Sequence, residues 1–279
     1  MEHHFSPFGE LINRLLGPLV LPLLEAVGVH PHDTARPIPD HIATMVLIGL
    51  LFVVFGLWFR NKVSAERPTA MQLVIEQILS NDVRVGVYDL LDSIVGHHGR
   101  KYLAVVGTVG LFVLACNAIS LVPAFASPTA NHTVPLGCAA FVFLYYNLEG
   151  ASVHGLLGYL KHFIGPALSA PVAMWPVMIP LLFVIEVISN VARLLSLTVR
   201  LWVNMVVSEL LYLTFLGLGV LMVVGGWHIN KGLGVAAGII PLVIPTPFVA
   251  LHIFVAVLQA FVFTLLPIVY IGGAVAEEH

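Results

Sequence analysis

Four ionisable side chains interrupt one long apolar stretch of this 279-residue sequence. The charged residues from Val172 to Gly226 are Glu186, Arg193, Arg200 and Glu209. A charged side chain in the middle of a membrane helix costs at least about 2.5–3.5 kcal/mol on insertion scales. Such groups usually line a water path or meet a partner, so each of the four is a candidate functional residue.

Helical spacing sorts these side chains by face. Glu186, Arg193 and Arg200 follow one another at intervals of seven residues, which turns the helix by only about 20° per step. Asn204 comes one turn after Arg200 and lies about 40° from the same line. Glu209 comes nine residues after Arg200 and faces the opposite side. A helix with polar groups on two sides is predicted to separate two hydrated regions.

A second apolar stretch carries His252 and Gln259, again seven residues apart on one face. If the two helices are antiparallel and Gln259 is level with Arg200, His252 and Glu209 lie about 10.5 Å and 13.5 Å toward the outer side. The spacing therefore allows an Arg200/Gln259 level at mid-membrane and a Glu209/His252 level nearer the outside. The helical faces agree less well, because Arg200 and Glu209 lie on opposite sides of their helix whereas His252 and Gln259 lie on the same side of theirs. Either one of the two contacts is water-mediated or the helices cross steeply.

Structural roles compete with these assignments. Arg193 could extend toward the membrane surface or pair with Glu186, whereas Arg200 is about 21 Å along the axis from Glu186 and is too far to be its partner. His252 could be a packing residue. None of the thirteen histidines shows metal-ligand spacing with a Glu or Cys, so we expect neither a metal nor a cofactor.

The composition requires a membrane around these helices. The sequence is 59% hydrophobic and 10% charged, against about 25% charged residues in soluble domains. The net charge of −3 does not favour a nucleic-acid partner. The sequence therefore predicts an all-α integral membrane protein in a lipid bilayer.

About five spanning helices are expected, because a span needs about 20 mostly apolar residues. The last two are predicted to be long and tilted. The segment before Pro180 is either part of an oblique helix or a separate short element. The expected spans are Ile42–Phe59, Tyr102–Phe125, Val134–Gly150, a helix within Val172–Gly226, and Phe248–Ile271.

Two further segments are predicted to lie at the membrane surface. Arg67–His98 has apolar residues at helical spacing but carries Glu76 and Arg84, which is typical of an amphipathic surface helix. Leu11–Val29 is interrupted by charges and prolines, and it does not resemble a signal peptide. We therefore expect residues 1–40 to form an extracytoplasmic, interfacial segment and residues 41–279 to form one membrane-embedded domain.

The distribution of cations predicts the orientation. Six lysines and arginines follow the first span, and none lies in the connection around Ser127. Because positively charged loops stay in the cytoplasm, five spans place the N-terminus outside and the C-terminus in the cytoplasm. The six are Arg60, Lys62, Arg67, Arg84, Arg100 and Lys101.

The run from Ser196 through Arg200 and Asn204 to Leu210, and the final helix from Leu251 to Tyr270, resemble subunit a of the rotary F-type ATP synthase membrane sector. The Pro128–Thr133 turn and the Ile119–Pro123 helix end are similar to that family as well. The resemblance covers roughly residues 40–279. Departures from the family pattern are Val203 and Leu194, where glycine or another small residue and proline are usual, and Ser120, where aspartate is common.

The resemblance implies a stator subunit that is not catalytic on its own. Two offset half-channels would pass protons to and from the carboxylates of a c-subunit ring, coupling ion flow to rotation and ATP synthesis. Glu209 and His252 would line the outer half-channel and Glu186 the inner one. Arg200 would face the ring carboxylate, Gln259 would orient Arg200, and Asn204 would lie along the proton path.

The implied partners are the c-ring, the peripheral-stalk b subunits and the remaining F-type ATP synthase, in a bacterial plasma (inner) membrane. A stand-alone ion channel or secondary transporter is an alternative, although such folds often contain inverted repeats and none is visible here. A scaffold subunit is another, and it would tolerate Arg200→Ala.

Overall fold

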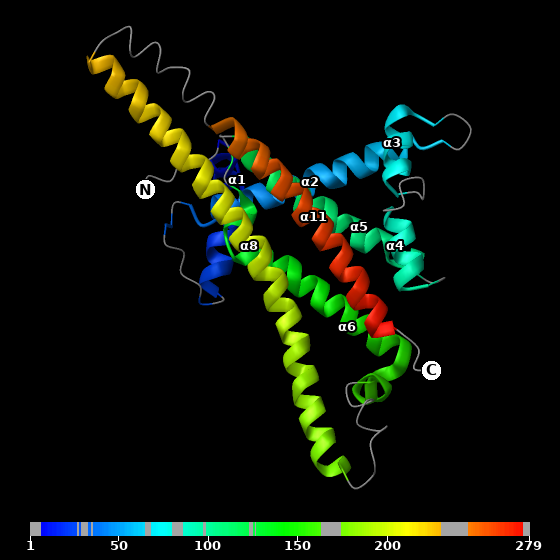
Figure 1. Cartoon of the computed structure of the whole chain (residues 1–279). Coiled ribbons are helices and arrows are strands. Elements are labelled where there is room, and N and C mark those ends of the chain that lie inside the picture. The colour runs from blue at the N-terminus through cyan, green and yellow to red at the C-terminus, as the bar shows by residue number, and fades with distance from the viewer. Residues whose placement is uncertain are drawn as a thin grey trace. The chain divides into compact units, whose positions relative to one another are not determined.

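The structure, a computed structural model shown in Figure 1, is built from helices. It describes residues 7–26, 28, 33–34, 36–64, 68–79, 86–96, 99–122, 125, 127–162, 174–229 and 245–275, and no β-strand occurs among them. The α-helices are α1 (Pro7–Ala26), α2 (Asp40–Arg60), α3 (Ala70–Leu79), α4 (Val87–Ile94), α5 (Leu103–Ala118), α6 (Thr133–His162), α8 (Trp175–Ile229) and α11 (Pro245–Val275). Short 3₁₀ turns are η2 (Gly99–Tyr102), η3 (Ile119–Leu121) and η4 (Pro128–Ala130).

Five helical segments in the described ranges are long and apolar enough to cross a membrane, which confirms the prediction of an all-α integral membrane protein. In a bilayer a helix satisfies its own backbone hydrogen bonds, so an uninterrupted apolar run folds this way. The five are Asp40–Arg60, Gly99–Leu121, Thr133–Gly155, Trp175–His228 and Thr246–Val275.

Helix α8 is one continuous element of 55 residues and includes Pro180, so no separate short element precedes this proline from Trp175 onward. At 1.5 Å per residue it measures about 80 Å, well beyond a hydrocarbon core of about 30 Å. Only 11% of its most apolar window is buried within the chain, compared with 17–28% for the other four spans. Most of this window is therefore not buried by the rest of the chain.

Several predicted boundaries are wrong. The single surface helix predicted over Arg67–His98 is replaced by α3 and α4, because the backbone at Gly86 is extended (ψ 146°). Residues 67, 80–85 and 97–98 of that prediction lie outside the described residues. The second span ends at Leu121 rather than Phe125, since Val122 is extended.

The third and last spans are longer than predicted. Helix α6 continues past Gly150 to His162, with a kink at Gly155, whose positive φ of 73° is a conformation that glycine adopts without strain. The chain after Gly150 is therefore helical as far as His162, and residues 163–173 are not described. Helix α11 begins at Pro245 because proline is tolerated in the first helical turn.

The chain divides into two compact units. One comprises Met1–Phe59, Phe112–Val134 and Leu201–Ala260, and the other comprises Arg60–Leu111, Pro135–Arg200 and Phe261–His279. The first unit contains α1, α2 and the second half of α8. The second contains α3, α4, most of α6 and the first half of α8.

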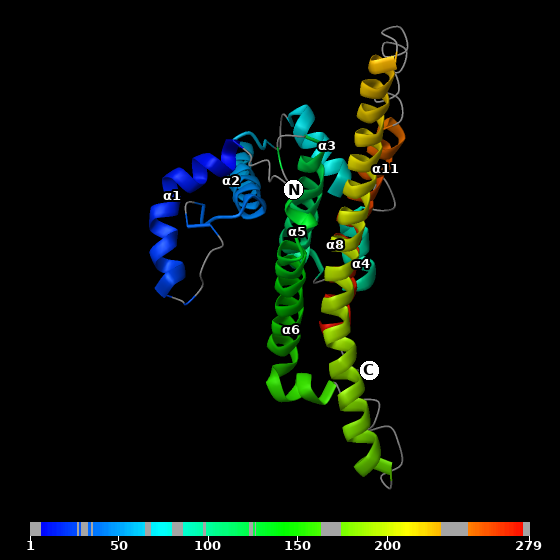
Figure 2. The same ribbon diagram turned by 90° about the vertical axis from the view of Figure 1, so that its left-hand side faces the viewer.

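In the first unit, α1 lies beside the start of α2 (Figures 1 and 2). The Asn13 side chain holds the two together, since it donates to the Ile38 carbonyl (2.8 Å) and accepts from the Ile38 N–H (2.9 Å). An ion pair between Glu10 and Arg36 (3.0 Å) adds to this contact. The predicted helix near the N-terminus is thus present, and its interfacial position stays a prediction.

Candidate functional site

His252 lies on α11 in the first unit, with both ring nitrogens within hydrogen-bond distance of a serine hydroxyl. Its Nε2 is 2.7 Å from Ser120 Oγ and 3.4 Å from the Asn117 carbonyl, and its Nδ1 is 3.0 Å from Ser208 Oγ. The side chain is 4% exposed. The imidazole therefore connects α11 to the end of α5 and to α8 by hydrogen bonds on both sides of the ring.

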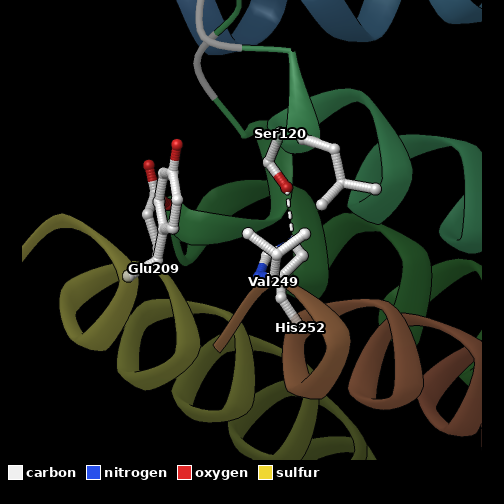
Figure 3. Close-up of a pocket in the computed structure, with 6 residues that line it drawn as sticks. Ser120, Glu209, Val249 and His252 are labelled. Carbon is white, nitrogen blue, oxygen red and sulfur yellow. Dashed lines mark hydrogen bonds between the residues drawn. The ribbon is translucent and has the colours of Figure 1, made fainter. Parts of the chain in front are cut away.

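Glu209 and His252 line one pocket of about 130 Å³, together with Ser120, Leu121, Tyr212 and Val249. Figure 3 shows Glu209 on α8, His252 on α11 and Ser120 at the end of a third helix, with the dashed hydrogen bond from Ser120 to the imidazole. At about 30 Å³ per molecule, the pocket has room for about four waters. Within the described residues, no hydrogen bond joins Glu209 to His252.

A polar turn follows the pocket residues Ser120 and Leu121 in the chain and is held to α5 and α8 by hydrogen bonds. Thr129 donates to the Asn117 side-chain oxygen (2.7 Å), and the Trp202 indole on α8 donates to the Ala130 carbonyl (3.0 Å). Asn117 is fully buried, and its Nδ2 has no hydrogen-bond partner among the described residues. A buried donor of this kind is normally satisfied by an ordered water, which supports a hydrated site.

A separate polar cluster joins α6 and α8 within the second unit. The Tyr146 hydroxyl donates to Asn190 Oδ1, and Asn190 Nδ2 donates to Asn147 Oδ1 (2.9 Å). Tyr159 donates to the same Asn147 oxygen (3.0 Å). Because the bilayer interior offers no alternative partners, these bonds fix how α6 and α8 pack there.

Arg193 is paired in the same unit. Its guanidinium lies 3.6 Å from a Glu186 carboxylate oxygen and 5.4 Å from the centroid of the Tyr270 ring. The Tyr270 ring in turn packs against Tyr146 at 5.6 Å. Of the two alternatives for Arg193, the structure therefore has the ion pair with Glu186, strengthened by a cation–π contact.

Arg200 differs from Arg193. Its side chain is exposed, and it forms no ion pair with any residue that the structure describes. Asn204 is half-buried, whereas Gln259 is fully buried and neither of its amide atoms has a described partner. Arg200 ends the second unit and Gln259 belongs to the first, so their common level stays a prediction.

In the described part of the chain, no group of three or more His, Cys, Asp and Glu side chains could hold a metal ion. The polar groups of the two clusters are hydroxyls, amides, one imidazole and a few charges. Side chains of these types can form hydrogen bonds with water, and the imidazole and carboxylates among them can exchange protons.

Comparison with known proteins identifies the family. A family model described as ATP synthase A chain matches residues 42–272. The chain belongs to the ATP synthase A chain family. The resemblance predicted from the two C-terminal motifs is thereby confirmed, and with five apolar spans this member of the family is a multi-pass membrane protein.

Curated relatives align with nearly the whole length of this chain. An ATP synthase subunit a from Koribacter versatilis is 34% identical over 273 residues, covering 98% of this chain and 97% of its own. One from Solibacter usitatus is 36% identical, covering 91% and 93%. One from Desulfosudis oleivorans is 37% identical, covering 92% and 96%. The similarity to the Koribacter protein extends beyond the family match, into the N-terminal segment.

Sequence reasoning missed part of the site. Ser208, Asn117 and Thr129 around His252 were not selected, and neither were Tyr146, Asn147 and Asn190 in the second unit. A signal was available, since amides and hydroxyls within apolar spans are uncommon and need buried partners. The selection started from ionisable residues and added only Asn204 and Gln259 at helical spacing from them, so it passed over the other amides and hydroxyls.

Proposed function

We propose that this chain is the stator subunit of an ATP synthase ion channel, which passes protons to and from carboxylates on a ring of c subunits. The observation that carries the proposal is the state of Arg200. It is an exposed cation on α8 without an ion-pair partner among the described residues, and its exposed neighbours Leu195 and Val199 are apolar. An unpaired charge at this depth requires a partner, which another chain supplies.

The outer half-channel contains Glu209 and His252. Their shared pocket, with room for about four waters, supports a hydrated path to the level of the ring. Protons enter here and neutralise a ring carboxylate. A neutral carboxyl group can rotate into lipid, whereas hydrocarbon strongly disfavours the ionised group.

The inner half-channel contains Glu186. Protons released by the ring after nearly a full turn leave along this side to the cytoplasm, in the orientation that places the N-terminus outside. Because Arg193 is the cation paired with Glu186, Arg200 is left without an ion-pair partner within the described residues. Asn204, one turn from Arg200, adds a polar group along the path.

Arg200 stabilises the ionised form of the ring carboxylate that faces it and blocks a direct proton route between the half-channels. Arginine suits both tasks because its guanidinium stays protonated at any accessible pH. Gln259 orients the guanidinium. The buried and unpaired amide of Gln259 is what supports this assignment.

Coupling to ATP synthesis belongs to the assembled F-type complex, including the c-ring and the peripheral-stalk b subunits, in a bacterial inner membrane. The chain itself supplies the ion path and carries out no reaction on ATP.

The test uses membrane vesicles that contain the whole complex. Arg200→Ala should abolish ATP-driven proton pumping, while ATP hydrolysis by the detached catalytic sector persists. Val199→Ala, which shortens an exposed apolar neighbour, serves as the matched control and should pump normally. Undiminished pumping by an assembled Arg200→Ala complex would refute the stator function.

A further inference from the structure

The hydrogen positions around His252 follow from counting donors and acceptors. Ser120 carries one hydroxyl hydrogen and donates it to the Asn117 carbonyl at 2.6 Å. The 2.7 Å contact between Ser120 Oγ and His252 Nε2 then needs its hydrogen from the ring. The Asn117 carbonyl, 3.4 Å from Nε2, only accepts. With an acceptor-only carbonyl beside it, Nε2 is the nitrogen that these contacts favour for the proton of the neutral ring.

Ser208 lies beside the other ring nitrogen, and its hydroxyl also has two possible acceptors. Its Oγ is 3.0 Å from His252 Nδ1 and 3.0 Å from the Met205 carbonyl. When the ring is neutral, the Ser208 hydrogen points at Nδ1. When the ring is charged, Nδ1–H donates to Ser208 Oγ and the Ser208 hydrogen points at the Met205 carbonyl. Both protonation states are satisfied without moving a heavy atom.

We propose that Ser208 is the hydroxyl through which His252 takes up and releases its exchangeable proton at Nδ1, while Ser120 keeps Nε2 protonated. This rests on the proposed function, in which His252 lies on the outer proton path. On uptake, the Ser208 hydrogen moves to Nδ1 and Ser208 Oγ accepts a proton from a hydronium ion in the channel, which leaves as water. The ring gains one proton, and the new Ser208 hydrogen bonds to the Met205 carbonyl. Release runs through the same steps in reverse.

Burial makes this hydroxyl hard to replace. Ser208 is 6% exposed and His252 is 4% exposed, so a charged Nδ1–H without Ser208 faces a nearly closed space. The other titratable groups lining the pocket with His252 are Glu209 and Tyr212, and neither forms a hydrogen bond to the imidazole among the described residues. Ser208 thus provides the described side-chain partner of Nδ1.

The functional test measures the initial rate of ATP-driven proton pumping in vesicles with the whole complex. Ser208→Ala should slow pumping by at least about tenfold, the factor for losing a hydrogen bond to a charged group. Ser208→Thr keeps the hydroxyl group on Cβ and should therefore pump at most of the wild-type rate. Thr214→Ala is the matched control, since this exposed α8 hydroxyl bonds only to the Leu210 carbonyl of its own helix.

Two results would overturn the inference about Ser208. One is wild-type pumping by an assembled Ser208→Ala complex, and the other is a Ser208→Thr complex as slow as Ser208→Ala. His252→Ala separates this inference from the proposed function. If His252→Ala is inactive while Ser208→Ala is normal, only the role of Ser208 fails; if His252→Ala itself pumps normally, the outer path through His252 fails.

A spectroscopic measurement tests the assignment independently of the rate. The complex is labelled with ring-¹⁵N histidine, and the spectrum of the His252→Ala complex is subtracted to isolate the His252 signals. At alkaline pH we expect a protonated Nε2 and an unprotonated Nδ1, with Ser120→Ala weakening this preference. A His252 signal with the proton on Nδ1 in the neutral ring would contradict the proposal.

Discussion

Asn190 offers a quantitative test of the polar cluster in the second unit. It accepts from the buried Tyr146 hydroxyl and donates to Asn147 Oδ1. Asn190→Ala leaves the tyrosine hydroxyl unsatisfied, at about 1–3 kcal/mol, and removes one hydrogen bond worth about 0.5–1.5 kcal/mol. Asn147 keeps its bond from Tyr159. We therefore expect a loss of about 2–4 kcal/mol in unfolding free energy.

A double-mutant cycle checks that the loss comes from the hydroxyl left unpaired. Tyr146→Phe alone should cost less than Asn190→Ala, because it removes the buried donor. Replacing both partners, as in Tyr146→Phe with Asn190→Ala, should cost about 1–2 kcal/mol less than the sum of the two single changes. The coupling is measured by titrating the purified chain in mixed micelles with SDS and following the fluorescence of its four tryptophans.

Val191→Ala, a truncation of an exposed side chain next to Asn190, is the matched control and should stay close to wild type. Additive costs in the cycle, or a Tyr146→Phe variant less stable than Asn190→Ala, would refute the reasoning.

Two further changes test the packing. Asn13→Ala removes the bonds to both backbone groups of Ile38, so limited proteolysis should cleave the N-terminal segment at least severalfold faster; unchanged resistance would argue against the clamp. Gly272→Ala places a methyl 2.8 Å from Ile94 Cγ2 and 3.0 Å from its carbonyl, whereas Gly273→Ala meets nothing within 4 Å. Only the first should lower the thermal stability of the complex, and equal effects would contradict this difference.

Hydropathy predicted the membrane spans because few backbone conformations satisfy all their own hydrogen bonds inside a bilayer. A long apolar run must become a helix, so five spans could be expected from composition and length alone. Boundaries were less predictable, since they depend on single backbone conformations. Gly86 divides the expected surface helix in two, and Gly155 kinks α6 instead of ending it.

The site was predictable to the extent that it depends on axial distance. A rise of about 1.5 Å per residue was enough to suggest one level for Glu209 and His252, and the structure places both around one pocket. The serine partners of His252 depend on how each helix is rotated and on the 3₁₀ turn that aims Ser120. Such details arise from packing, so a count of spacings along the chain did not find them.

The low burial of α8 also bears on how the cell must produce this chain. A helix with 11% of its most apolar window buried, carrying an unshielded guanidinium, is an incomplete surface until its partners arrive. A newly inserted copy is exposed to misassociation with other membrane proteins and to membrane proteases that remove orphan subunits. On the proposed function this partner is the c-subunit ring, and the steady-state amount of the chain should then follow the supply of ring subunits rather than its own rate of synthesis.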